Sequence, residues 1–156
     1  MTNNENLVEN LNDLIRINND RIAGYEKAAE EARTIDVDLR AIFSRMSEES
    51  AQYAAELTQE VVKHGGEPAT GTTNSGKIYR VWMDVKVAFS GKDRQAILEN
   101  CEFGEDAAQK AYDLALKSDA EMSADVRQLI TNQKSSLRTS HDLIKKYRDA
   151  HKAVNS

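Results

Sequence analysis

The sequence predicts an all-α protein, a four-helix bundle in which one long crossover joins the second and third helices. Two observations carry this prediction. Apolar residues recur at helical spacing in four segments of similar length, each roughly 40 Å long at about 1.5 Å per residue. Turn-forming residues are concentrated in one stretch between the second and third segments. Because 156 residues suit one domain, we expect a single bundle over 1–156.

The first two helices are expected to form an antiparallel hairpin. The first is predicted over about 6–33 and the second over about 36–63, with Asp36 as the expected N-cap. Gly65 and Gly66 follow directly and can end the second helix. So short a connection between two helices makes them antiparallel neighbours. The apolar face of the first helix is expected to consist of Leu7, Leu11, Leu14, Ile15, Ile22, Tyr25, Ala29 and Ala32.

The crossover is predicted over 65–92. It starts with a glycine-rich turn that contains Pro68, the only proline of the chain. A short extra helix is predicted within it over 77–90, and this helix carries Trp82.

The third and fourth helices complete the predicted bundle. The third is expected over about 93–117 and the fourth over about 124–152, with Ser123 as the N-cap of the fourth. Their tight connection makes them a second antiparallel hairpin. The crossover before them is long enough to run back along the bundle. An up-down-up-down bundle with a large loop excursion is the alternative.

Composition and charge exclude several classes of function. Acidic residues outnumber basic ones, 26 to 21, and the net charge of −5 argues against nucleic-acid binding. No apolar segment is long enough to cross a bilayer, and the first residues lack the basic and apolar regions of a signal peptide. The single cysteine, Cys101, excludes an intramolecular disulfide and fits a reducing compartment. We therefore expect a cytoplasmic protein with no nucleic-acid partner and no membrane insertion.

Glu105 is the most informative polar residue of the predicted core. It interrupts the apolar face of the third helix, four residues after Cys101, three before Ala108 and seven before Tyr112. A buried carboxylate must be paired, protonated or bound to a metal. The facing helices therefore have to supply the group that neutralises Glu105.

One way to neutralise such a carboxylate is a metal site. Two-metal carboxylate bundles use Glu-x-x-His pairs, but none of His64, His141 and His151 has a glutamate three residues earlier. Oxygen-only sites of low charge usually bind weakly, so a hydrogen-bond network that fixes helix register is the other interpretation. The candidates for an iron or manganese site are Glu49, Gln52, Glu105 and Gln133, with Asn18, Glu102, His141 and Glu26 in second rank.

The level of each candidate along the bundle follows from counting outward from the two tight turns. This counting places Asn18 of the first helix near Glu49 of the second. It places Glu105 between Gln133 and His141 of the fourth helix. Asn18, Glu49 and Glu105, with Gln133 or His141, are therefore expected in one polar layer. Glu26 is expected about two helical turns away.

Nearly the whole chain resembles the bacterial ferritin-like four-helix-bundle proteins of unknown function. The resemblance implies a ferritin-like fold with its crossover helix. It also implies distant kinship with ferritins, rubrerythrins and stress-induced ferritin-like proteins, and through them a metal or stress role. The segments that carry it are Leu11–Ile15, Gly24–Glu30, the turn Gly65-Gly66-Glu67-Pro68, the Trp82 helix, Gly104-Glu105-Asp106 with Tyr112, and Gln133 followed by His141-Asp142.

The resemblance to ferritins also bears on the site. In ferritins the metals are held by a Glu from the first helix, a Glu-x-x-His from the second, a Glu from the third and often a Gln from the fourth. Glu49, Glu105 and Gln133 match this plan. Asn18 or Asn19 stands where the first carboxylate belongs and Gln52 where the histidine belongs, which argues against ferroxidase activity.

Two functional hypotheses follow from these observations. The favoured one is a non-catalytic, stress-associated scaffold that associates with itself as a homo-oligomer and has a polar core layer. No small-molecule substrate is identified for it. The alternative is a ferritin-like iron- or manganese-binding oxidoreductase or metal-storage protein with a degenerate site.

Overall fold

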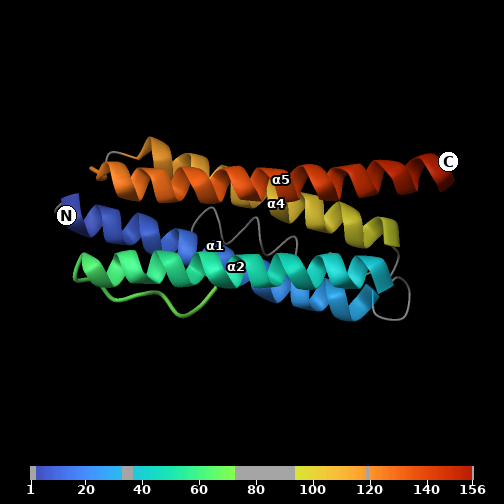
Figure 1. The fold of residues 1–156 in the computed structure, drawn as a ribbon, viewed down its shortest axis with the longest axis horizontal. Coiled ribbons are helices and arrows are strands. Elements are labelled where there is room, and N and C mark those ends of the chain that lie inside the picture. The colour runs from blue at the N-terminus through green and yellow to red at the C-terminus, as the bar shows by residue number, and fades with distance from the viewer. Residues whose placement is uncertain (1–2, 33–36, 73–93, 119, 156) are drawn as a thin grey trace.

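The computed structural model describes residues 3–32, 37–72, 94–118 and 120–155. These residues form four α-helices and no strand (Figure 1). The predicted 77–90 helix with Trp82 and the predicted cap Asp36 lie outside the described residues. The four helices are α1 (Asn3–Ala32), α2 (Val37–Lys63), α4 (Arg94–Lys117) and α5 (Ala124–Asn155). Every end lies within three residues of its prediction, and the all-α four-helix bundle is confirmed.

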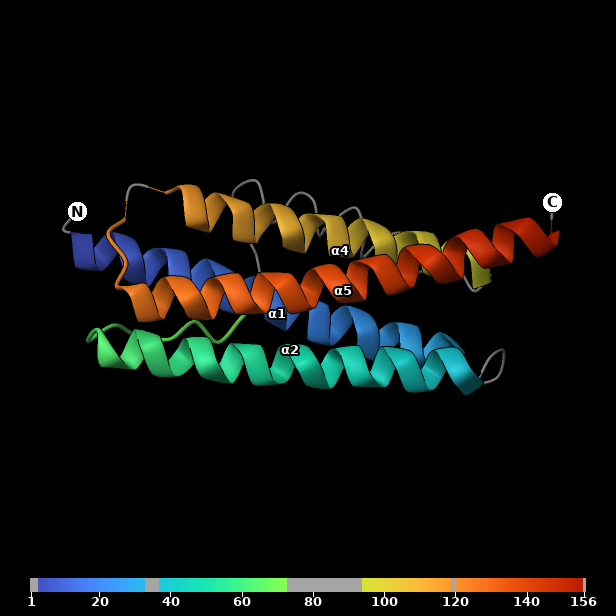
Figure 2. The same cartoon turned by 45° about the horizontal axis from the view of Figure 1, so that its top comes forward.

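The helices follow an up-down-down-up order. α1 runs antiparallel to α2, and α4 runs antiparallel to α5 (Figure 1). α2 ends at the opposite end of the bundle from the start of α4, so these two helices run in the same direction (Figure 2). The predicted crossover along the bundle is confirmed, and the up-down-up-down alternative is wrong. A single long crossover of this kind is the arrangement of ferritin-like folds.

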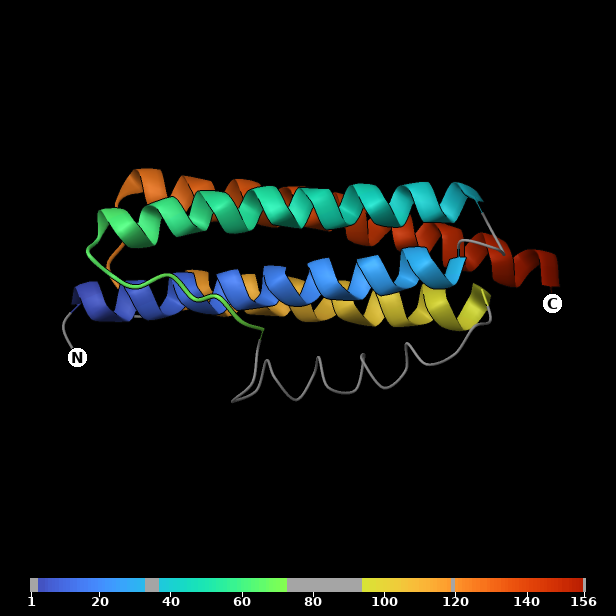
Figure 3. The same cartoon turned by 90° about the horizontal axis from the view of Figure 1, so that it is seen from below.

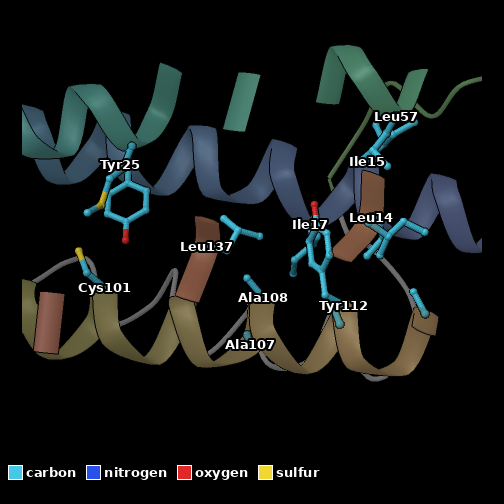
Figure 4. Close-up of a cluster of buried hydrophobic side chains, with 14 of the residues drawn as sticks. Leu14, Ile15, Ile17, Tyr25, Leu57, Cys101, Ala107, Ala108, Tyr112 and Leu137 are labelled. Atoms are coloured by element: carbon cyan, nitrogen blue, oxygen red, sulfur yellow. The ribbon is translucent and has the colours of Figure 1, made fainter. Parts of the chain in front are cut away.

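The core is centred on α1, which packs against both α2 and α4, whereas α2 and α5 make the least contact of the neighbouring helices. Of the predicted apolar face of α1, Ile22 and Ala29 are half-buried and the rest is buried. In Figure 4, Tyr112 of α4 points toward Ile17 of α1, and Tyr25 of α1 points toward α4. None of the described helices is long and apolar enough to span a lipid bilayer.

α2 ends as its sequence predicts, in a glycine turn. The Gly66 N–H donates to the Val61 carbonyl at 3.0 Å, and the Gly65 N–H donates to the Val62 carbonyl at 3.0 Å. This pair of bonds is a Schellman motif, in which the last helical carbonyls are satisfied by the residues just beyond the helix. Gly65 has a φ of 75°, a backbone conformation that favours glycine. At the start of α5, the predicted cap is confirmed because the Ser123 hydroxyl accepts from the Val126 N–H at 3.2 Å.

Three asparagines of α1 hold the first part of the crossover against that helix, where it runs back along α1 (Figure 3). The Asn4 amide donates to the carbonyl of His64 at 2.8 Å. The Asn12 amide donates to the carbonyl of Glu67 at 2.9 Å and accepts from the N–H of Ala69 at 2.8 Å. The Asn19 amide donates to the carbonyl of Gly71 at 2.9 Å. Backbone groups that have no helical partner here are thus satisfied by side chains. We call Asn4, Asn12 and Asn19 the asparagine ladder.

Alanine substitutions at Gly66 and Gly71 test how closely this turn packs on α1. A Cβ on Gly66 would lie 2.5 Å from Cγ1 and 2.9 Å from Cγ2 of Val8, so Gly66→Ala forces the turn away from α1. We expect a loss of about 1–3 kcal/mol in the free energy of unfolding, as for other overpacked sites. Gly71→Ala is the matched control, because a Cβ at Gly71 meets nothing within 4 Å. Urea unfolding of both variants measures the difference, and equal losses would contradict the close packing.

Candidate functional site

The candidate site is built around a charged residue in the apolar column of α1. Leu7, Leu14, Arg21 and Ala28 recur at intervals of seven residues, and all four are buried. This spacing keeps them on one side of the helix, facing the rest of the bundle. Arg21 is fully buried, with 0 % of its surface exposed. A guanidinium is always charged in proteins, so the core has to supply its counter-ion.

That counter-ion is Glu105 of α4. Arg21 donates from Nε and Nη2 to the same oxygen, Glu105 Oε1, at 2.9 and 2.6 Å. The Tyr25 hydroxyl donates to this oxygen as well, at 2.5 Å. On the α2 side, Arg21 Nη1 donates to the Ser50 hydroxyl and lies 3.5 Å from Glu49 Oε1. We call Arg21, Tyr25, Glu49, Ser50 and Glu105 the arginine cluster. It joins α1, α2 and α4 through one buried cation.

The electrostatics of the cluster fix its protonation. Burial, the largest single effect, lowers the pKa of Arg21, but Glu105, Tyr25 and Glu49 together raise the pKa above its ordinary value. Burial raises the pKa of Tyr25 well above its ordinary value, and the Glu105 charge raises it further. Tyr25 therefore stays protonated and donates its hydrogen bond, while Arg21 stays charged. The guanidinium carbon also lies 5.1 Å from the centre of the Tyr25 ring, a cation–π contact.

The arginine cluster reaches solvent at Glu49. The Glu49 side chain is 30 % exposed, and its Oε1 accepts from the Ser140 hydroxyl of α5 at 3.0 Å. A cavity of about 260 Å³ opens here between α2 and α5. Its lining includes Ile42, Met46 and Leu143 together with Glu49 and Ser140. The arginine cluster therefore runs from the buried Arg21–Glu105 pair to Glu49, a carboxylate that contacts solvent at this cavity.

A second group of polar side chains, all buried except the half-buried Glu56, lies beside the arginine cluster. The Asn18 amide donates to the Tyr112 hydroxyl at 2.8 Å, and that hydroxyl donates to Gln133 Oε1 at 2.7 Å. The Gln133 amide then donates to Glu56 Oε1 at 3.1 Å. Burial raises the pKa of Tyr112, so its hydroxyl keeps the proton that the chain of bonds needs. We call Asn18, Tyr112, Gln133 and Glu56 the tyrosine chain, which links all four helices.

The single polar layer expected from the sequence is therefore divided between two hydrogen-bonded groups. Glu49 and Glu105 come together at Arg21. Asn18 and Gln133 come together at Tyr112.

The other predicted candidates lie away from both groups. Gln52 and Glu26 are exposed, and Glu26 borders a surface hollow between α1 and α2. Glu102 accepts from Arg148, and His141 contacts Asp106 across the outer side of α4 and α5.

The core layer does not fit a two-metal carboxylate centre. Such a centre needs inward carboxylates and histidines from facing helices. Here Arg21 places a fixed positive charge against both Glu49 and Glu105, and it would repel a metal ion at contact distance. Glu105 Oε2 and Asn18 Oδ1 are buried without a hydrogen-bond partner among the described residues, but oxygens alone, without an imidazole, bind a divalent ion weakly. The imidazole of His141, which was expected in this layer, bonds to Asp106 and Asp142 instead.

Sequence reasoning missed Arg21, the residue on which the site depends. The signal was present in the seven-residue interval that Arg21 shares with Leu7, Leu14 and Ala28. An arginine in such a column indicates a buried cation, and the interrupted face of the third helix already indicated a buried anion at Glu105. Taken together, a buried arginine in the first helix and a buried glutamate in the third predict an ion pair between them.

A double-mutant cycle measures the pairing of Arg21 with Glu105. Glu105→Leu leaves a buried guanidinium without its carboxylate, and Arg21→Met leaves the reverse, so each should lower the free energy of unfolding by about 3–5 kcal/mol. The double variant should lose much less than either single variant, or gain stability, because no buried charge remains. Urea unfolding of the parent and the three variants checks this. Additive losses would mean that the two side chains are not a unit.

Comparison with known proteins places the chain in a family. The family model described as "Domain of unknown function (DUF2383)" matches residues 6–118, well over half of the chain. The matched segment contains every residue of the arginine cluster and ends one residue beyond α4. No curated protein matches the chain. By the family model, and with the bundle described above, the chain belongs to the DUF2383 family of domains of unknown function.

Proposed function

We propose that this protein is a non-catalytic, self-associating helical scaffold whose arginine cluster fixes the register of the helices. The observation that carries the proposal is the position of Arg21, which neutralises Glu105 where a ferritin would use metal ions. The cluster thereby performs a structural task with side chains alone. A stress-related context, in the cytoplasm, is part of the proposal and rests on the resemblance to stress-induced ferritin-like proteins.

The geometry of the ion pair explains how it can fix the register. The guanidinium presents a rigid, planar set of donors, and Arg21 uses Nε and Nη2 on Glu105 and Nη1 on Ser50. Sliding α4 along α1 by one helical turn would move the Glu105 carboxylate by about 5.4 Å. Both charges would then be unpaired in an apolar interior. Buried polar groups have this specifying role in some bundles.

Self-association is supported by the exposed side of α4. Phe103 and Leu114 are 50 % and 47 % exposed, although large apolar side chains are usually buried. They lie eleven residues apart, about three helical turns, so they share one side of α4. Two copies related by a two-fold axis would place α4 against α4, with Phe103 of each copy near Leu114 of the other.

Sedimentation tests the scaffold proposal directly. We expect the parent protein to sediment as a dimer or larger assembly, with an apparent mass at least twice the 17.5 kDa of the chain. Phe103→Asp combined with Leu114→Asp should give a monomer with an unchanged helical circular dichroism spectrum. Val62→Asp is the matched control, because Val62 is 60 % exposed on α2 and should leave the assembly intact. A parent protein that is monomeric at every concentration would overturn self-association.

The alternative of a degenerate iron or manganese site is favoured by one observation. Glu105 Oε2 is buried and has no hydrogen-bond partner among the described residues, so this oxygen has capacity for a ligand. The scaffold proposal expects no bound iron or manganese after purification without chelator, and no oxidation of added Fe²⁺. Bound metal in the parent that disappears in Glu105→Gln would replace the proposal by the metal-binding alternative.

A further inference from the structure

Three potential metal ligands meet on the outer side of the α4–α5 hairpin, apart from the arginine cluster. Glu102 and Asp106 lie four residues apart on α4, which places both carboxylates on the same side of that helix. His141 faces them from α5, with its Nε2 at 2.5 Å from Asp106 Oδ1. One ligand atom from each of the three residues lies within 4.8 Å of the other two.

A fourth residue orients the imidazole. Asp142 Oδ1 lies 3.1 Å from His141 Nδ1. This acceptor keeps a proton on Nδ1, so the proton that a metal ion displaces is the one that Nε2 shares with Asp106 Oδ1. Metal-binding histidines almost always donate their second ring N–H to a carboxylate or carbonyl in this way.

We propose that Glu102, Asp106 and His141 bind a zinc ion at the surface of the α4–α5 hairpin. One imidazole and two carboxylates are ligands that Zn²⁺ accepts, with water or a further group in the fourth position. Two carboxylates balance the charge of a divalent ion. The site fastens α4 to α5, and bound zinc therefore stabilises this hairpin without entering the core.

The present geometry needs only a small adjustment to admit the ion. With zinc–ligand distances of about 2.0–2.2 Å, tetrahedral ligands stand roughly 3.3–3.6 Å apart, wider than the bond between Asp106 and His141. The Asp106 side chain is 60 % exposed, so it can rotate outward. Because the remaining separations do not exceed 4.8 Å, Glu102 has to move inward by no more than about 1.5 Å.

Arg148 is the competing cation at this site. Its Nη1 donates to Glu102 Oε2. Nε and Nη2 donate to Asp149 Oδ1 at 3.1 and 2.7 Å. Arg148 can therefore release Glu102 to zinc and remain paired with Asp149. Because a cation must leave Glu102 before zinc can use it, Arg148 lowers the affinity of the site.

Calorimetric titration of the chelator-treated protein with zinc chloride tests the proposal. We expect one zinc per chain, with binding weakened at least about tenfold by His141→Ala and about tenfold by Asp142→Asn. Arg148→Gln should bind zinc more tightly than the parent, an effect that non-specific surface binding would not show. His64→Ala is the matched control, because His64 bonds to its own helix at the Glu60 carbonyl and should leave zinc affinity unchanged.

Two outcomes would overturn the site. One is a parent protein that binds no zinc in this titration, and the other is equal zinc affinity in the parent and in His141→Ala. Because His141 lies at the surface side of the bundle, circular dichroism of the zinc-free variant should match the parent and show that folding is intact. Zinc X-ray absorption of the loaded parent should show one imidazole with oxygen ligands. The zinc result is separate from the scaffold proposal, which is tested by association through α4 and by the expected lack of bound iron and manganese.

Discussion

The buried ion pair between Arg21 and Glu105 is the constraint on which the arrangement of the helices depends. Each charge would be strongly unfavourable in the core without the other, so α1 and α4 can approach only in the register that joins them. Ser50 and Glu49 bring α2 to the same guanidinium. α5 contacts the cluster through the Ser140 hydroxyl on Glu49. α2 and α5 make the least contact of the neighbouring helices and leave a cavity between them.

The helices could be predicted from the sequence because their signals are local. Helical spacing, the glycine turn after α2 and the Ser123 cap each depend on residues a few positions apart, and all were confirmed. The site depends on pairings between distant residues, such as Arg21 with Glu105, which are 84 positions apart. Counting from the turns placed Asn18 at the level of Glu105, but the rotation of each helix decides which side chains meet. Asn18 consequently bonds to Tyr112, while Arg21, one turn further along, takes Glu105.

The two polar groups of the core differ in what they connect and in how they are charged. The arginine cluster carries a full ion pair and ends at a carboxylate in contact with solvent. The tyrosine chain between Asn18 and Gln133 is uncharged until it reaches Glu56, and each of its bonds crosses to a different helix. Together they place hydrogen-bond requirements on all four helices at mid-length, where purely apolar faces would tolerate sliding. A bundle with these features holds its geometry without a metal in the core.

The asparagine ladder connects only residues of the first half of the chain, so its hydrogen bonds can form before the second half is synthesised. Asn4, Asn12 and Asn19 bind the loop after α2 to α1, so a nascent chain can close this N-terminal hairpin before α4 leaves the ribosome. That early hairpin still contains Arg21, whose partner Glu105 is made later. Until α4 docks, the guanidinium must stay hydrated, and the hairpin cannot complete its interior around it. The order of synthesis therefore leaves the N-terminal hairpin exposed to water on the side that α4 will cover. When the C-terminal half docks there, Glu105 pairs with Arg21.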